Sequence, residues 1–367
     1  MSWARSFARL WRCAAGAFLV VRCVSCGAGE GTIAPGQPSD GPGGSDYEHA
    51  AATRTKVLAV ESIGSTDLDV GFVLHEPAVP AVPRGPIQVV LFLHGGVFSE
   101  EEPHLAHLEH LVRHGYFVVY PTGWWLPHDQ NAVVALRALR AALARLAEKG
   151  YADPAVSFVG FSSGAMVAMR AACDASTRAA LGLPAPRAIV AMDAAGGNSP
   201  LFAWLKPTHL AFIPATTRLT FILSEPSFRE AMAEPTRCDK DWSRSEPSSA
   251  CGAWSVVKSA WKSAVQIPRE GKTAVVVPSD AFPRDGAPAV RLVSDHQGCT
   301  SGSIQAPLDA IDWYGYWKTV DLALGLAHGR YKASADPGSL QDVLTDMGRY
   351  RTGDEVLRMS VISAKLD

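Results

Sequence analysis

The heptapeptide VGFSSGA, residues 159–165, decides how this chain is expected to fold. It ends an apolar stretch and opens an Ala-rich one, Ala165–Cys173, so a buried strand is expected to pass through a sharp turn directly into a helix. A Gly-X-Ser-X-Gly string in this strand–turn–helix context is typical of a nucleophile elbow. Gly160 and Gly164 leave room for the strand and the helix to approach closely, and the helix N-terminus adds a positive dipole behind Ser162. We therefore predict that Ser162 is a nucleophile.

Short apolar stretches alternate with helical patterns along the rest of the chain, which indicates an α/β fold. The first two strands should pair antiparallel through the turn at 65–67, and the later ones should form a mostly parallel sheet with helices on both faces. We expect strands at Val57–Glu61, Val70–Leu74, Val89–Leu93, Tyr116–Tyr120, Val156–Val159, Ala188–Met192, Leu219–Leu223 and Ala274–Val277. We expect helices at His104–His114, Val133–Lys149 and Ala165–Cys173, and an amphipathic helix whose stripe of Trp254, Val257, Trp261 and Val265 packs on the sheet.

A second motif, LHGGV at residues 93–97, ends an earlier strand. A turn of this kind directs a backbone N–H at a substrate carbonyl oxygen. We predict an oxyanion hole made by the N–H groups of Gly96 and Ser163, with Val97 replacing Gly96 if the loop is shifted by one residue.

The strings LFLHGG (91–96), RHGYFVVYP (113–121), VGFSSGA (159–165) and DAIDWYGYWK (309–318) together resemble the α/β-hydrolase superfamily. Within it, the chain looks closest to the branch with chlorophyllases, platelet-activating-factor acetylhydrolases and dienelactone-hydrolase-like esterases. The resemblance covers about Val57 to Gly329. It implies the α/β-hydrolase fold and a catalytic triad in the chain order serine, acid, histidine.

Two carboxylates are candidates for the acid of this triad. Asp193 ends one strand in AMDAAGG, where chlorophyllase-like members place their acid, and Glu225 ends the next strand in ILSEPS, where many other hydrolases do. Either carboxylate could hold a histidine tautomer. Asp193 is preferred because the glycines that follow it match the resembling branch, and Glu225 is kept as the alternative acid.

Three histidines follow the elbow in the sequence, and one is predicted as the base. His296, in SDHQG, comes after the last predicted strand, as the triad order requires. His209 precedes the strand that ends at the second candidate acid, and His328 lies at a helix end, where it fits a C-terminal cap.

The N-terminus has the pattern of a targeting segment. Three arginines precede a short apolar run, Cys13–Val21, which is typical of a signal peptide, and Cys26 resembles the acceptor cysteine of a bacterial lipoprotein signal. We expect a signal peptide at 1–26, a Gly-, Pro- and Ser-rich linker at 27–52 and an α/β-hydrolase domain at 53–367. The protein is expected to be exported as a periplasmic, outer-membrane or cell-surface lipoprotein, or alternatively to be secreted, and to meet a membrane only through a lipid on Cys26.

Further residues carry weaker expectations. Cys238 and Cys251 flank a polar loop and could form a disulfide in an oxidising compartment. Trp124 and Trp125 follow a strand near the expected pocket mouth, where they contact substrate or simply pack. His104, His107, His110 and His114 share one helical face, a spacing that could bind a metal. Because no carboxylate or cysteine completes a site, we predict no metal and a partly solvated face.

Composition narrows the function further. Hydrophobic residues make up 47%, charged residues 19%, and the formal net charge is −2, so the chain is globular and lacks the basic excess of a nucleic-acid-binding protein. The resemblance and the motifs together predict a serine hydrolase that cleaves a small-molecule or lipid ester through an acyl-enzyme, without a cofactor. Two alternatives remain open: an inactive hydrolase-fold binding protein at the cell surface, and an acyltransferase that uses the same triad.

Overall fold

The computed structural model describes residues 55–63, 70–77, 86–95, 101, 104–122, 128–194, 207–233, 249–282, 290–292, 309–331, 337–350 and 353–366. All of them belong to one compact unit, Ile33–Asp367. The predicted signal peptide and linker, and Cys26 with them, lie outside these residues. No helix among the described residues has the length and apolar character needed to cross a membrane.

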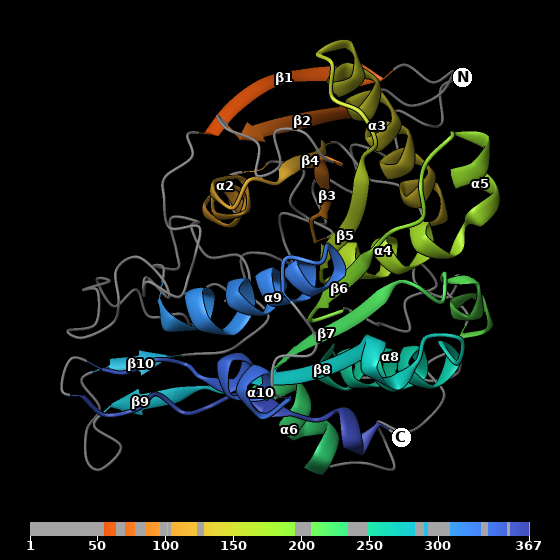
Figure 1. Ribbon diagram of the computed structural model, residues 1–367. Coiled ribbons are helices and arrows are strands. Elements are labelled where there is room, and N and C mark those ends of the chain that lie inside the picture. The colour runs from red at the N-terminus through yellow and green to blue at the C-terminus, as the bar shows by residue number, and fades with distance from the viewer. Residues whose placement is uncertain are drawn as a thin grey trace, which may run out of the picture. The chain divides into compact units, whose positions relative to one another are not determined.

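A nine-stranded sheet lies at the centre of the described unit, in the order β1-β2-β4-β3-β5-β6-β7-β8-β11 (Figure 1). The six strands from β4 to β8 run parallel, whereas β1, β2 and β11 are antiparallel to their neighbours. The predicted mostly parallel sheet and the predicted β1–β2 pair are therefore confirmed. The strands are β1 Thr55–Ile63, β2 Val70–Pro77, β3 Gln88–Leu93, β4 Phe117–Thr122, β5 Ala155–Phe161, β6 Ala188–Met192, β7 Arg218–Ser224, β8 Lys272–Val277 and β11 Ser360–Val361; β9 Asp280–Phe282 and β10 Val290–Leu292 form a separate hairpin.

Helices cover both faces of this sheet (Figure 1). Residues of α3, α4 and α8 share one hydrophobic core, and residues of α2, η5 and α9 share the other. Along β3, successive residues alternate between the two cores, which explains why its sequence is apolar without interruption. The helices are α2 Leu105–Arg113, α3 His128–Glu148, α4 Ser163–Cys173, α5 Ala175–Ala180, α6 Glu225–Ala233, α8 Ser249–Ser263, α9 Lys318–Ala327 and α10 Pro337–Thr345, with a 3₁₀ segment η2 at Pro207–Phe212 and a π-helical segment η5 at Ile311–Trp317.

The tryptophan stripe of α8 is confirmed except at its last member. Trp254, Val257 and Trp261 are buried in the same core as α3 and α4. Val265 is 76% exposed, and its inclusion in the stripe was wrong. The helix ends at Ser263, so the helical spacing no longer applies two residues later.

The histidine face of α2, defined as His104, His107, His110 and His114, is not solvated as the sequence predicted. All four residues are between 1% and 8% exposed. The reason is a distant segment of the chain, because Trp317 at the end of η5 stacks on His107 at a ring-centroid distance of 5.2 Å. A contact across more than 200 residues leaves no local sequence signal.

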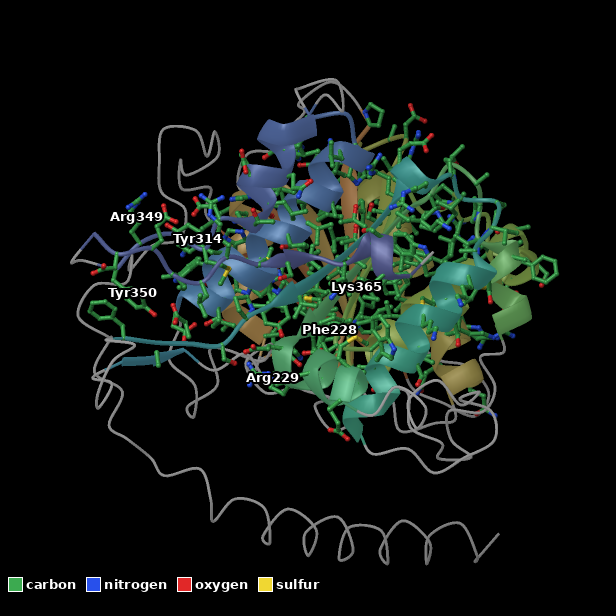
Figure 2. The ribbon with its side chains drawn as sticks, turned by 90° about the horizontal axis from the view of Figure 1, so that it is seen from below. Phe228, Arg229, Tyr314, Arg349, Tyr350 and Lys365 are labelled. Atoms are coloured by element: carbon green, nitrogen blue, oxygen red, sulfur yellow. The ribbon has the colours of Figure 1, made fainter. Side chains whose placement is uncertain are left out.

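The C-terminal segment extends the fold beyond the region of resemblance, which ended near Gly329. Its strand β11 pairs antiparallel with β8. Close to the end of the chain, the Lys365 ammonium lies 5.0 Å from the ring centroid of Phe228 on α6 (Figure 2). The C-terminal segment therefore contacts both the sheet, through β8, and the helix α6.

Candidate functional site

The turn between β5 and α4 holds Ser162 in a strained backbone conformation. Its φ is 55° and its ψ is −122°, a combination that L-residues rarely adopt. The Ser162 N–H donates to the Met192 carbonyl at 2.9 Å, which fixes the turn to the neighbouring strand β6. The residue is 8% exposed. Such strain costs about 1–3 kcal/mol and persists only where the surrounding structure enforces it.

Two glycines make this turn sterically feasible. A Cβ on Gly160 would lie 2.4 Å from the Gly164 carbonyl oxygen, and a Cβ on Gly164 would lie 2.0 Å from the Leu93 carbonyl oxygen. These distances are far inside van der Waals contact, so β5, α4 and the end of β3 meet at spacings that only glycine permits. The predicted role of both glycines is confirmed.

The loop after β3 begins directly against the elbow. A Cβ on Gly95 would come within 3.2 Å of the Ser162 Cβ. His94 is buried, and burial lowers its pKa to about 4, with the backbone hydrogen bond at Gly95 acting in the opposite direction. The neutral imidazole therefore donates from Nδ1 to the Gly95 carbonyl at 2.8 Å, which fixes the start of this loop.

One of the two predicted oxyanion donors lies within the described part of the chain. Ser163 is the first residue of α4, and the first N–H groups of a helix have no partner within that helix. Gly96 and Val97 lie outside the described residues.

Asp193 lies beside the elbow at the carboxyl edge of the sheet. Phe161 and Met192 are paired in register between β5 and β6, so Ser162 and Asp193 are the next residues of two adjacent strands. Asp193 is fully buried and has a φ of 39°, unusual for a residue other than glycine. The end of β6, like the end of β5, therefore carries a polar side chain on a strained backbone.

The Asp193 carboxylate is held by two side chains that the sequence analysis did not single out. Its Oδ1 accepts hydrogen bonds from the Ser224 N–H at 2.8 Å and from the Ser224 hydroxyl at 3.1 Å. Its Oδ2 accepts one from the Tyr316 hydroxyl at 3.0 Å. Ser224 lies in ILSEPS and Tyr316 in DAIDWYGYWK, so both lay in quoted strings, but nothing in those strings indicated a common partner.

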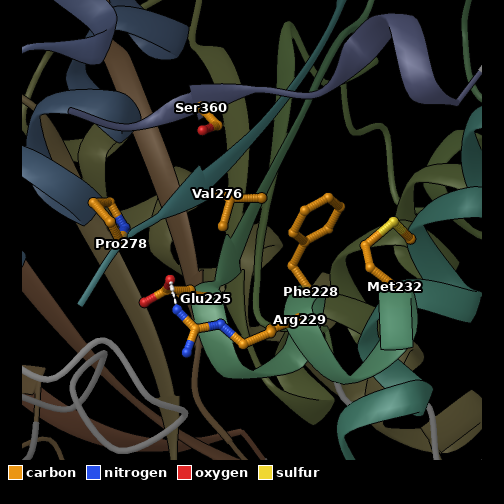
Figure 3. A pocket seen from close by; sticks show the side chains of 7 residues that line it. All are labelled: Glu225, Phe228, Arg229, Met232, Val276, Pro278 and Ser360. Carbon is orange, nitrogen blue, oxygen red and sulfur yellow. Dashed lines mark hydrogen bonds and ion pairs between the residues drawn. The ribbon is translucent and has the colours of Figure 1, made fainter. Parts of the chain in front are cut away.

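Glu225 has a different environment. Its Oε2 accepts a hydrogen bond from the Ser279 N–H at 2.8 Å, and its Oε1 forms an ion pair with Arg229 one turn later on α6. The carboxylate faces a pocket of about 240 Å³ (Figure 3). The other lining residues are Phe228, Arg229, Met232, Val276, Pro278 and Ser360. This pocket contains neither Ser162 nor Asp193.

The described histidines that follow the elbow do not include the predicted base. His296 lies outside the described residues. His328 follows α9 and contacts the Ser157 hydroxyl at 2.9 Å, near the amino end of β5 and thus at the end opposite the elbow. Burial lowers the pKa of His328 to about 4, helped by nearby Arg330 and Arg187. This placement agrees with the prediction that His328 is a helix cap rather than a base.

Other predicted site residues are not placed. Trp124, Trp125 and Cys238 lie outside the described residues. Cys251 lies in the first turn of α8, where the side chains are not described.

The comparisons with known proteins agree with this architecture. The model of the alpha/beta hydrolase family matches residues 90–342, more than half of the chain. This chain belongs to the alpha/beta hydrolase family, which confirms the resemblance found in the sequence and supports a hydrolase function. None of the curated proteins matches the sequence.

Solved structures similar to this chain include hydrolases and esterases. A dienelactone hydrolase from Anabaena variabilis ATCC 29413 is 17% identical, with 64% of this chain and 91% of that chain covered and a TM-score of 0.39. Esterase B from Lactobacillus Rhamnosis is 14% identical, with 64% and 79% covered and a TM-score of 0.39. A structure from a study of two esterases of Rhizomucor miehei is 13% identical, with 78% and 89% covered and a TM-score of 0.47. Likeness at these levels is too distant to indicate a substrate.

Proposed function

We propose that this protein is a serine hydrolase that cleaves carboxylic esters through an acyl-enzyme. The observation that carries the proposal is the backbone of Ser162, whose φ of 55° and ψ of −122° place a serine at the apex of a strand–helix turn. A protein that used this serine only for packing would gain nothing from a conformation that costs about 1–3 kcal/mol.

In the proposed mechanism, the Ser162 hydroxyl attacks the ester carbonyl while His296 accepts its proton. The negative charge that develops on the carbonyl oxygen is stabilised by the N–H groups of Ser163 and Gly96, with the dipole of α4 adding to the field. His296 then returns the proton to the leaving alcohol. A water molecule, deprotonated by the same imidazole, releases the acid and regenerates the serine.

Asp193 is the proposed acid that orients His296. It is fully buried at the end of the strand adjacent to the elbow, and three hydrogen bonds from Ser224 and Tyr316 fix its carboxylate. Such bonds fix the position in which a carboxylate can accept an imidazole N–H. Glu225 is instead engaged by Arg229 and by the Ser279 N–H beside a separate pocket.

The proposal is tested by labelling the purified full chain with a fluorophosphonate probe and by assaying it on p-nitrophenyl esters of increasing chain length. Wild type should label and turn over, and Ser162→Ala should do neither while retaining its thermal unfolding transition. Ser163→Ala is the matched control, because it removes the adjacent hydroxyl but keeps the backbone N–H, and it should retain both labelling and measurable turnover.

Three outcomes would contradict this proposal. Labelling that persists in Ser162→Ala and vanishes in Ser163→Ala would move the nucleophile by one residue. A folded wild type that neither labels nor turns over any ester would favour the binding-protein alternative. Products in which the acyl group passes to an added alcohol in preference to water would favour an acyltransferase.

A further inference from the structure

Two helices on the same face of the sheet bring three metal-ligating side chains together. His110 lies on α2, His114 is the residue that caps the end of α2 one turn later, and Asp321 lies on α9, more than 200 residues later in the chain. The three residues are between 3% and 8% exposed. None of them belongs to the proposed triad. The sequence predicts no metal here because no carboxylate completes the histidine face, whereas in the structure Asp321 supplies a carboxylate from a distant helix.

The possible ligand atoms of this cluster lie close to one another. The His110 Nε2 lies 2.6 Å from the Asp321 Oδ2, and the His114 Nδ1 lies 3.2 Å from the Asp321 Oδ1. One ligand atom from each residue can be chosen so that all three lie within 4.8 Å of one another. In a tetrahedral zinc site with bonds of about 2.0–2.1 Å, neighbouring ligand atoms are roughly 3.3 Å apart. The His114 contact has this spacing and the His110 contact is shorter, but the two contacts reach different oxygens of Asp321. Zinc bound by a single carboxylate oxygen therefore requires a shift of the side chains.

The charges of the cluster also favour a cation. The Asp321 carboxylate is buried, and its two oxygens face the imidazoles of His110 and His114. A buried carboxylate needs compensating positive charge, and imidazole nitrogens and carboxylate oxygens are common zinc ligands.

We propose that His110, His114 and Asp321 bind one zinc ion, with a water molecule as the fourth ligand. Two imidazole nitrogens and one carboxylate oxygen form a common donor set for zinc in proteins. The i, i+4 spacing of the two histidines is the one by which a helix presents two imidazoles to a single zinc ion.

The surroundings of the cluster are built as expected for a metal site. The Trp317 ring centroid lies 5.0 Å from that of His110, and the Trp313 ring meets the same imidazole edge-on at 5.9 Å. These indoles form an apolar wall that limits water access to the cluster. An apolar shell of this kind strengthens the electrostatic attraction between ligands and ion.

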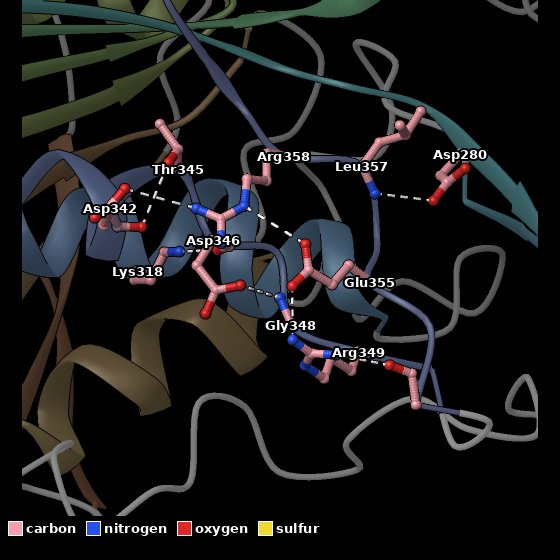
Figure 4. A network of polar contacts seen from close by, with 11 residues as sticks. Asp280, Lys318, Asp342, Thr345, Asp346, Gly348, Arg349, Glu355, Leu357 and Arg358 are labelled. Carbon is pink, nitrogen blue, oxygen red and sulfur yellow. Dashed lines mark hydrogen bonds and ion pairs between the residues drawn. The ribbon is translucent and has the colours of Figure 1, made fainter.

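The C-terminal segment fixes the helix that supplies the carboxylate. Lys318, at the start of α9 and one turn before Asp321, donates from its ammonium to the Asp346 backbone carbonyl (Figure 4). Burial lowers the pKa of Lys318 to about 8, with Asp346 acting to raise it. Because α9 is anchored in this way, a zinc ion would tie α2 to a rigid partner.

The expected role of the zinc ion is structural, with an effect on the neighbouring site. The helix α2 follows the loop that holds Gly95, and the His104 ring at its start packs against Phe161, the residue before Ser162, at 5.9 Å. Joining α2 to α9 would therefore help to hold the contact between His104 and Phe161 beside the elbow.

The test uses the full chain purified without a polyhistidine tag, stripped with a chelator and dialysed. Elemental analysis after reloading and calorimetric titration with zinc chloride should give one equivalent. At a free zinc concentration of about 100 times the dissociation constant, the thermal unfolding midpoint should rise by roughly 5 °C. His114→Ala and Asp321→Asn should each lose zinc affinity by more than the roughly 10- to 100-fold typical of outer-shell substitutions. His328→Ala, which removes a half-buried histidine outside the cluster, should bind zinc as wild type does.

Four results would overturn the proposal. They are a stripped chain that takes up no zinc, zinc binding that survives unchanged in both ligand variants, loss of binding in His328→Ala, and uptake of iron(II) or manganese(II) in preference to zinc. If the variants fail to fold, cobalt(II) added to the stripped wild type decides the matter. An intense visible absorption from four-coordinate cobalt, displaced by one equivalent of zinc, is expected, and a weak six-coordinate spectrum would contradict the assignment.

Discussion

The strain at the nucleophile elbow predicts that the glycine variant at position 162 is more stable than the alanine variant. Ser162 adopts φ 55° and ψ −122°, which glycine tolerates and alanine does not. Ser162→Gly and Ser162→Ala both lack the hydroxyl, and the Ser162 side chain makes no capping hydrogen bond that either variant would lose. Comparing the two variants therefore isolates the backbone strain from catalysis and capping.

The magnitude follows from two opposing terms. Relief of strain should favour glycine by about 1–3 kcal/mol, and the greater freedom of glycine in the unfolded chain should cost it about 0.5–1 kcal/mol. The net expectation is that Ser162→Gly is more stable than Ser162→Ala by about 1 kcal/mol, or about 2 °C in the unfolding midpoint of a domain of this size. The assay is thermal and denaturant unfolding of the two purified variants under identical conditions.

The adjacent residue provides a control of opposite sign. Ser163 begins α4 with helical geometry, so Ser163→Gly should be less stable than Ser163→Ala by up to about 1 kcal/mol. If both positions favoured alanine, Ser162 would not be strained in solution. That result would remove the observation on which the proposed function depends.

Three further predictions concern the site and the core around it. Asp193→Asn should lower ester turnover by roughly 10⁴-fold because the base loses its orienting partner, whereas Glu225→Gln should stay within a few-fold; equal mild losses would contradict the triad as drawn. Gly164→Ala places a Cβ 2.0 Å from the Leu93 carbonyl oxygen, so denaturant unfolding should show a loss at or above the roughly 1–3 kcal/mol of ordinary overpacking. His328 has a folded pKa of about 4 against 6.5 in the unfolded chain, so its neutral form stabilises the fold above pH 6.5 and that contribution is lost as the pH falls toward 4. His328→Gln should therefore make the fall in stability between pH 7 and 5 shallower, and an unchanged slope would show that this histidine does not titrate as described.

Local patterns predicted the elements and the elbow well. The apolar strands and amphipathic helices were found within a few residues of their observed bounds, because strand and helix periodicity is a property of neighbouring residues. The strained turn at Ser162 was predictable for the same reason, since two glycines at fixed spacing around a serine constrain only the local backbone. Val265 was wrongly included in the buried stripe of α8 because helical periodicity does not indicate the residue at which a helix ends.

Contacts between segments far apart in the chain could not be predicted from the sequence. The Tyr316 hydroxyl reaches Asp193 from 123 residues away, and Asp321 reaches His110 from 211 residues away. Both depend on how η5 and α9 pack against the sheet, which no local pattern encodes. The histidine face was predicted to be solvated for this reason, since α2 viewed alone has nothing to cover it.

The short strand β11 pairs with β8 and so covers the hydrogen-bonding edge of β8 that faces away from β7. β11 pairs with Val275 and Val276, the Ile362 N–H donates to the Ala274 carbonyl at 2.9 Å, and the Ala274 N–H donates to the Ser363 hydroxyl at 3.1 Å. Without these last residues, a buried valine-rich strand would present its open hydrogen-bonding edge to other molecules, which is the usual starting point for edge-to-edge aggregation. Residues 360–363 therefore cover a strand edge at which two molecules could pair. We expect their removal to cause aggregation at protein concentrations where the remaining monomer still retains its catalytic activity.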